Sequence, residues 1–330
     1  MAALLDVKNL HVTFRTRKET VKAVRGVSFA MGREKIGIVG ESGSGKSVTC
    51  RALLGLVRPP GTVTADHLLF DGVELRQTDP RHMRAIRGRR ISMVMQDPKY
   101  SLNPVMTVGD QIAEAYRIHA RASQAEARRK TIEMLEAVRI RRPEQVYDTY
   151  PHEVSGGMGQ RIMVAMMLIP GPDLLIADEP TSALDVTVQL QLLAIMDDLV
   201  QQRGMGLIFI SHDLNLVASF CDRIIIMYAG RIIEQADVRQ LFDNPRHPYT
   251  RALIAAAPVI GRGKRRRRGV LTGDVPSPMN PPAGCPFHPR CPHAIEVCRA
   301  EPVALGPSSS GQQAACHRLE ELRRRQVRQL

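Results

Sequence analysis

The sequence of 330 residues contains no tryptophan, and aromatic residues make up only 4% of it. Proteins that bind single-stranded nucleic acid stack its bases on aromatic side chains, so that class of function is disfavoured. No apolar run approaches the roughly 20 residues of a membrane-spanning helix, and the longest, at 162–169, predicts a buried helix. The first residues lack the basic start, apolar stretch and cleavage site of a signal peptide. We therefore expect a cytoplasmic protein that reaches a membrane only through a partner.

Acidic residues are outnumbered: 33 of them stand against 46 lysines and arginines, for a net charge of +13. Such an excess suits nucleic acid or an anionic membrane face, or it reflects an arginine-rich composition without a specific partner. The densest basic run, 264–268, lies between two glycines and predicts a solvated linker. Of the six cysteines, Cys50 and Cys221 stand in apolar surroundings and are expected in the core.

Short apolar segments alternate with helical patterns along most of the chain, which favours an α/β fold with a parallel sheet. Before the sequence Asp71-Gly72, residues 68–70 predict a hairpin. The predicted strands are 4–12, 23–29, 36–39, 91–95, 174–177, 207–210 and 224–227. The predicted helices are 46–56, 186–202 and one that begins near 214. A further helical stretch is predicted at 107–168, with an interruption at 150–157.

A glycine-rich loop follows the strand at 36–39 and matches the phosphate-binding pattern Gly-x-x-x-x-Gly-Lys-Ser/Thr. Its residues are Gly40, Glu41, Ser42, Gly43, Ser44, Gly45, Lys46 and Ser47. The glycines let backbone N–H groups point at phosphate oxygens, and the following helix adds its positive end. We expect Lys46 to reach the β- and γ-phosphates and Ser47 to hold Mg²⁺.

Two adjacent acids, Asp178 and Glu179, end the apolar strand about 130 residues further on. Phosphoryl transfer needs positioned water, metal and positive charge more than covalent chemistry. Asp178 is expected to complete the Mg²⁺ shell, directly or through water. Glu179 is expected to orient and polarise the attacking water.

Further motifs stand in a fixed order around this pair. They are Gln96 in Met-Gln-Asp-Pro, the string Tyr-Pro-His-Glu-Val-Ser-Gly-Gly-Met at 150–158, Ser-Ala-Leu-Asp at 182–185, and His212 in Ile-Ser-His-Asp. Over residues 1–255 the chain therefore resembles the ATP-binding-cassette (ABC) superfamily, whose signature is usually Leu-Ser-Gly-Gly-Gln. The resemblance implies a P-loop NTPase cassette with a mainly parallel sheet core, an N-terminal antiparallel β subdomain and a helical subdomain at about 104–163.

The resemblance also assigns roles. Gln96 would contact Mg²⁺ or the attacking water. His212 would bond the γ-phosphate and hold Glu179 in place. Phe14 would stack on adenine, although an aromatic residue in a first strand is at least as often part of the core. The signature loop would present backbone N–H groups to the γ-phosphate of ATP held by a second cassette. Its residues are Ser155, Gly156 and Gly157.

Three positions depart from the superfamily pattern. Val154 replaces the usual leucine, Met158 replaces glutamine, and Gly159 stands where related importers usually carry arginine. Because the anion is bound by backbone groups, we expect the site to survive all three changes, with ATP affinity or coupling strength as the property affected.

Several strings resemble the dipeptide, oligopeptide and nickel importer group: 39–48, 96–104, 176–188, 247–250 and the tail at 284–292. The string at 176–181, with Gly157-Met158, is similar to the first of that group's two paired ATPases. This implies a heterodimer with a second ATPase, two membrane permeases and an external peptide-binding protein, at the cytoplasmic face of the inner membrane. Residues 256–330 would form a linker and a cysteine-rich extension.

Four cysteines fall in the last fifty residues: Cys285, Cys291, Cys298 and Cys316. Their spacing matches neither a Cys-x-x-Cys zinc site nor a common ferredoxin run, so free thiols stay an alternative. A tail this short builds little core, and a metal would stabilise it. The family resemblance points to a [4Fe–4S] cluster. Zinc is the runner-up, with His288, His293 or His317 as substitute ligands.

Two rival functions stay open at this point. The cargo of the same machinery could be nickel or another chelated metal, because permeases and binding proteins carry the specificity. A soluble cassette protein acting on nucleic acid or ribosomes is the other rival, but such proteins usually carry two cassettes in one chain. We therefore expect an ATPase of a peptide importer, with no nucleic acid partner.

Overall fold

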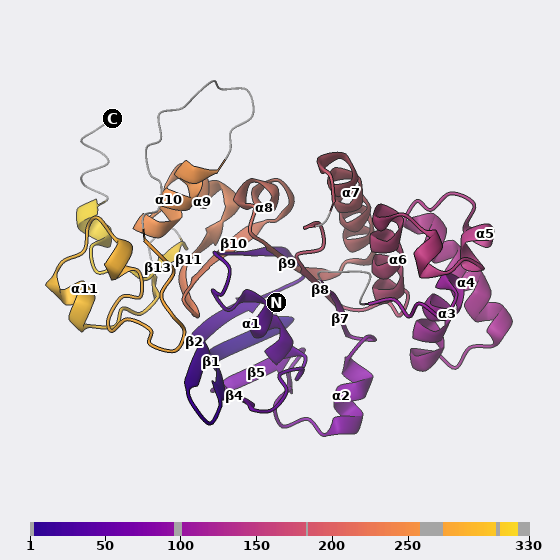
Figure 1. Cartoon of the computed structure of the whole chain (residues 1–330), viewed down its shortest axis with the longest axis horizontal. Helices are drawn as coiled ribbons and strands as arrows, with labels where there is room; N and C mark the ends of the chain where they lie inside the picture. The colour runs from indigo at the N-terminus through magenta and orange to yellow at the C-terminus, as the bar shows by residue number, and fades with distance from the viewer. Residues whose placement is uncertain (1–2, 96–100, 183, 258–272, 308–310, 323–330) are drawn as a thin grey trace. The chain divides into compact units, whose positions relative to one another are not determined.

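The computed structural model describes residues 3–95, 101–182, 184–257, 273–307 and 311–322 (Figure 1). They divide into two compact units: residues 1–31, 35–76 and 211–330 form the first, and residues 32–34 and 77–210 form the second. Gln96 and the basic run at 264–268 lie outside the described residues.

The first unit contains an antiparallel sheet (Figure 1). Its strands are, in order, β2 (Thr20–Met31), β1 (Leu5–Arg15), β5 (His67–Phe70) and β6 (Val73–Glu74), with β4 (Gly61–Thr64) also paired to β1. The hairpin predicted before Asp71 is confirmed: Phe70 pairs with Val73, and Asp71 and Gly72 both have positive φ, as a two-residue turn requires. The first two predicted strands are also confirmed and are longer than predicted.

A second sheet of the same unit joins distant parts of the chain. β3 (Lys35–Val39) runs parallel to β10 (Arg223–Tyr228), which pairs antiparallel with β11 (Arg231–Asp237). Two short tail strands extend it, β13 (Gln313–Ala314) beside β11 and β12 (Gly306–Pro307) beside β13. The helices of this unit are α1 (Lys46–Leu53), α8 (Leu214–Phe220), α9 (Val238–Asp243), α10 (Pro248–Ala256), the 3₁₀ turn η3 (His288–Arg290) and α11 (Glu296–Ala300). The tail is therefore built into this unit through main-chain hydrogen bonds.

Three parallel strands form the centre of the second unit, in the order β7 (Ile91–Val94), β8 (Leu174–Asp178) and β9 (Gly206–Ser211). Every residue of these strands is buried, which is typical of parallel strands covered on both faces. The helices of this unit are α2 (Pro80–Ile86), α3 (Val108–His119), α4 (Gln124–Ala137), α5 (Pro143–Tyr147), the 3₁₀ turn η2 (Pro151–Glu153), α6 (Gly156–Leu168) and α7 (Val186–Arg203).

The helical stretch predicted at 107–168 consists of α3, α4, α5 and α6, which gather in one group (Figure 1). Side chains cap the helices: Thr107 accepts from Asp110 N–H at the start of α3, and Ser123 accepts from Glu126 N–H at the start of α4. Such caps satisfy backbone donors that the first turn leaves unpaired. The apolar run at 162–169 lies in the buried α6 and its C-cap, as predicted.

Within the described part of the chain, no helix combines the length and the apolar character needed to cross a bilayer. Cys50 and Cys221 are buried, as the sequence predicts for core residues.

Candidate functional site

The phosphate loop connects β3 to α1 in the first unit. Its shape depends on glycine at two positions. Gly45 precedes α1 with φ of 98°, and a Cβ on Gly40 would lie 2.2 Å from the carbonyl oxygen of Met227. A side chain would strain the left-handed backbone at Gly45 and would clash with Met227 at Gly40, so glycine is needed at both positions. The strand–loop–helix context predicted for the motif is therefore present.

Polar groups of the loop point into its curve. Lys46 is 6% exposed, and its Nζ donates to the carbonyl oxygens of Gly40 at 2.8 Å and Glu41 at 3.1 Å. Ser44 is 1% exposed, and its Oγ is buried with no hydrogen-bond partner among the residues that the structure describes. A buried hydroxyl without a partner is unfavourable unless a ligand bonds it. The hydroxyl and the ammonium group suit the oxygen atoms of a phosphate.

In the second unit, Asp178 ends β8 and is 4% exposed. Glu179 follows it with φ of 48°, an uncommon conformation for a residue with a side chain. The structure holds this conformation with hydrogen bonds: Glu179 N–H donates to Ile210 O at 3.1 Å, and its carbonyl accepts from Ser182 Oγ at 3.1 Å. Strained backbone of this kind gathers at functional sites, so Glu179 is a candidate functional residue, and the role expected of it stays a prediction.

The signature residues occupy the N-terminus of α6. Ser155 is its N-cap and accepts a hydrogen bond from Met158 N–H at 3.3 Å. A Cβ on Gly157 would lie 2.7 Å from Cγ1 of Val188, whereas one on Gly156 would meet open space. Gly157 thus lets two helices approach, and Gly156 leaves the helix end accessible. The helix is capped normally although Met158 and Gly159 depart from the superfamily pattern, so the backbone donors are in place.

Two further predicted site residues, His212 and Phe14, lie in the first unit. His212 is exposed and directly follows β9, and Asp213 next to it caps α8 through the N–H groups of Asn215 and Leu216. Phe14 lies half-buried in β1, and its ring is close to Gly61. A Cβ added to Gly61 would lie 2.7 Å from Cε1 of Phe14. The structure therefore brings the phosphate loop, His212 and Phe14 into one unit, and the acidic pair and the signature into the other.

Hard oxygen donors are the ligands that Mg²⁺ prefers. The hydroxyl of Ser47, in the first turn of α1, and the carboxylate of Asp178 are donors of this kind. The chemistry of the predicted metal ligands is therefore suited to the ion.

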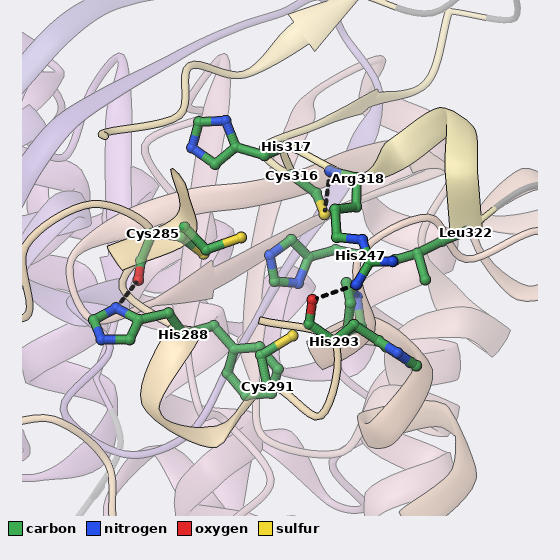
Figure 2. Close-up of a pocket in the computed structure, with 12 residues that line it drawn as sticks. His247, Cys285, His288, Cys291, His293, Cys316, His317, Arg318 and Leu322 are labelled. Carbon is green, nitrogen blue, oxygen red and sulfur yellow. Dashed lines mark hydrogen bonds between the residues drawn. The ribbon is translucent and has the colours of Figure 1, made fainter. Parts of the chain in front are cut away.

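The four tail cysteines line one cavity of about 10 Å³, which we call the cysteine cavity. Figure 2 shows the thiols of Cys285, Cys291 and Cys316 pointing into the same space beside His247. Cys285 N–H also donates to Cys298 O at 2.9 Å, which ties the first cysteine to α11. The sequence did not require this convergence, since five, six and seventeen residues separate the four cysteines.

The cysteine cavity has room for about one water molecule. Among the residues that the structure describes, no three His, Cys, Asp or Glu side chains lie close enough together to hold a metal ion. Burial raises the pKa of Cys285 and Cys291, and raises that of Cys316 to about 11. Burial therefore disfavours the thiolate form of these three cysteines, and the structure gives the iron–sulfur and zinc predictions no support beyond the shared cavity.

Three residues at the phosphate loop were not predicted as site residues. Glu41 belongs to the loop, and Tyr249 and Arg290 contact Glu41. Glu41 N–H donates to the Tyr249 hydroxyl at 3.1 Å, and the Arg290 guanidinium pairs with the Glu41 carboxylate. The only signal in the sequence was that Tyr249 and Arg290 belong to two of the strings similar to peptide importers. Nothing in those strings indicates that they meet at residue 41.

Comparison with protein families gives two matches. The ABC transporter model matches residues 24–182, and the model of the oligopeptide/dipeptide transporter C-terminal region matches residues 233–298. Among solved structures, a dimeric post-hydrolysis state of the ATP-binding cassette MJ0796 bound to ADP and phosphate is similar, with a TM-score of 0.64 and 26% identity. It covers 71% of this chain and 99% of that cassette.

Curated relatives are similar over nearly the whole length. The probable peptide ABC transporter ATP-binding protein y4tR of Sinorhizobium fredii is 49% identical, over 97% of this chain and 96% of the relative. The dipeptide transport ATP-binding protein DppD of Escherichia coli is 45% identical over 96% of each chain. The oligopeptide transport ATP-binding protein AppD of Bacillus subtilis is 43% identical, over 97% of this chain and 98% of the relative. The chain therefore belongs to the ATPases of ABC transporters, in the dipeptide and oligopeptide transporter group.

Proposed function

We propose that this chain binds and hydrolyses ATP to energise the import of dipeptides or oligopeptides. The observation that carries this proposal is 43–49% identity, over at least 96% of both chains, with ATP-binding proteins named for peptide, dipeptide and oligopeptide transport. The match of residues 233–298 to the C-terminal region of such transporters supports it.

The proposed nucleotide site has two parts. Gly40, Ser42, Gly43, Ser44 and Gly45 hold the phosphates, with Lys46 at the β- and γ-phosphates. Phe14 contacts the adenine. Mg²⁺, when bound, neutralises charge on the phosphates, and Ser47, Asp178 and Gln96 are its proposed ligands.

The catalytic part consists of Glu179, His212 and Gln96. Glu179 orients the attacking water, and its strained, hydrogen-bonded backbone fixes the carboxylate for that task. His212 donates to the γ-phosphate and positions Glu179. Gln96 senses whether the site is occupied.

The signature residues, Ser155 to Gly157, are proposed to serve a second cassette. The exposed N-terminus of α6 is accessible to an anion, and Gly156 leaves it free of side chains. One similar solved cassette is dimeric. We propose a heterodimer with a second ATPase, bound to two permeases at the cytoplasmic face of the inner membrane, with a peptide-binding protein on the other side.

We take residues 1–255 as the cassette, with its helical subdomain at about 104–163, and residues 256–330 as the linker and extension. We propose a [4Fe–4S] cluster in the extension, since all four donors face one cavity and are thiols, as such clusters require. Cys285, Cys291, Cys298 and Cys316 would hold such a cluster, one thiolate to each iron. The four sulfurs must therefore face a common space and need not meet at one ion. Loading would require the thiols to lose their protons and the cavity to open.

Purification of the tagged chain from detergent-solubilised membranes tests the function. We expect a second ATPase and two permeases to co-purify, and the ATPase activity of the isolated chain to be low and to rise at least tenfold in the complex. Ribosomes or DNA in place of permeases would contradict the proposal. Stimulation by a nickel chelate and its binding protein, with none by peptides, would change the cargo.

A further inference from the structure

The cysteine-rich extension contacts the phosphate loop through one side chain. Arg290 ends η3, and its side chain is 5% exposed. Its Nη1 donates to Glu41 Oε2 at 2.7 Å and its Nη2 donates to Glu41 Oε1 at 3.1 Å. Two parallel charge-assisted bonds fix the carboxylate in both position and direction. Glu41 is the second residue of the phosphate loop.

A second contact holds the backbone of the same residue. Glu41 N–H donates to the hydroxyl of Tyr249, which is fully buried in the first turn of α10. The Tyr249 ring packs against Tyr228, with ring centres 4.7 Å apart, and against Phe287 of the extension, at 5.4 Å. Arg290 Nη1 also donates to the Tyr228 hydroxyl at 3.2 Å. Both the main chain and the side chain of Glu41 are thus held by groups that pack on the extension.

The charge of Glu41 makes this contact relevant to nucleotide binding. An unpaired carboxylate beside a phosphate site repels the anion, and the repulsion is strong where burial limits screening. Arg290 neutralises that carboxylate. The hydrogen bonds to Glu41 in turn raise the pKa of Arg290 above its usual range, so the guanidinium stays charged. Glu41 O also accepts from Lys46 Nζ at 3.1 Å, which links the pair to the loop lysine.

We propose that Arg290 is a positioning residue for the phosphate loop: by neutralising and fixing Glu41, it lets the C-terminal extension contribute to nucleotide affinity. This inference rests on the proposed function, in which the loop binds ATP. It adds a role for the extension in the ATP site that does not depend on whether the cysteines hold a metal.

The test is the dissociation constant for ATP with Mg²⁺, measured by calorimetry on the full chain carrying Glu179→Gln to preserve the ATP. We expect Arg290→Gln to weaken binding roughly 5- to 50-fold, within the usual range for coupling between sites. Glu41→Gln should bind within about twofold of the parent, because it removes the carboxylate that repels the anion and leaves Arg290 in place. The double variant should bind like Glu41→Gln and not like Arg290→Gln.

This rescue separates positioning from damage to the fold, since a merely structural role for Arg290 would make the double variant at least as weak as the single one. The loss in Arg290→Gln should also shrink as salt increases. Arg318→Gln is the matched control: Arg318 belongs to the same extension, lines the cysteine cavity and pairs with Glu321. It should leave ATP affinity unchanged.

Unchanged affinity in Arg290→Gln, or no rescue in the double variant, would overturn the inference and leave the proposed function intact. A parent protein that binds no ATP would overturn both. If Arg290→Gln does not fold, Arg290→Lys replaces it, and the retained charge with fewer donors should give a smaller loss that Glu41→Gln again relieves.

Discussion

The side-chain amide of Gln312 donates a 2.7 Å hydrogen bond to Glu234 Oε1, and both side chains are at most 1% exposed. The same carboxylate accepts from the backbone N–H groups of Arg246 at 2.7 Å and His247 at 2.8 Å. Burial raises the pKa of Glu234, which these donors counteract. One buried carboxylate therefore joins β11, the start of α10 and the tail.

Replacing Gln312 with alanine should weaken the attachment of the tail. We expect a loss of about 1–3 kcal/mol in the free energy of unfolding, because a hydrogen bond to a buried charged group is lost. Urea denaturation followed by circular dichroism measures it. Gln313→Ala is the matched control, since Gln313 is only half-buried and bonds the neutral amide of Gln235. Equal losses in the two variants would contradict the importance of the Glu234 contact.

Replacing Glu179 with glutamine should lower ATP hydrolysis at least about a hundredfold and leave ATP affinity within about twofold, because only the orientation of water is lost. Lys46→Ala should instead weaken ATP binding. Steady-state phosphate release and equilibrium binding on the purified complex distinguish the two effects. Asp198→Asn removes an exposed carboxylate of α7 and should change neither. Near-normal turnover in Glu179→Gln would refute its assignment.

Anaerobic purification tests the proposed cluster directly. We expect about four iron and four sulfide per chain and a broad visible absorption band, as a [4Fe–4S] cluster gives. Cys298→Ser should lower the iron content, whereas Cys221→Ala, outside the cysteine cavity, should not. Colourless, iron-free protein from cells able to assemble clusters would reject the cluster, and bound zinc would establish the alternative.

Asp173 predicts a dependence of stability on pH. Burial alone would raise its pKa, but hydrogen bonds from Arg90 and Arg33, the latter at 2.7 Å, lower it overall. A carboxyl whose folded pKa lies below its unfolded value of about 3.9 stabilises the fold above that value, and loses this effect as the pH falls through the folded pKa. Asp173→Asn should therefore be less stable by about 1 kcal/mol from pH 7 to 5.

Below about pH 4 the difference between Asp173→Asn and the unchanged protein should narrow, since the wild-type carboxyl takes up a proton there as well. Urea unfolding at each pH measures this. Asp148→Asn is the comparison: Asp148 pairs with Arg128 at 3.5 Å on the surface, and such pairs contribute little. A difference that stays constant to pH 3 would show that Asp173 acts through shape and not through charge.

Local sequence determined much of this protein. The phosphate loop and the hairpin at Asp71-Gly72 could be predicted because each depends on residues a few positions apart, with glycine where φ is positive. The order of the motifs was enough to predict an ATP site and the family. The buried strands β7 to β10 followed from their apolar runs.

Tertiary structure alone decided where the tail packs. The tail strands β12 and β13 are only two residues long and have no periodic pattern, so their place beside β11 depends on pairing and not on propensity. Glu41 and Arg290 are 249 residues apart, and each resembles an ordinary surface charge in the sequence. They meet because Phe287, Tyr228 and Tyr249 pack together and exclude water, which places the guanidinium where a carboxylate of the phosphate loop needs a partner.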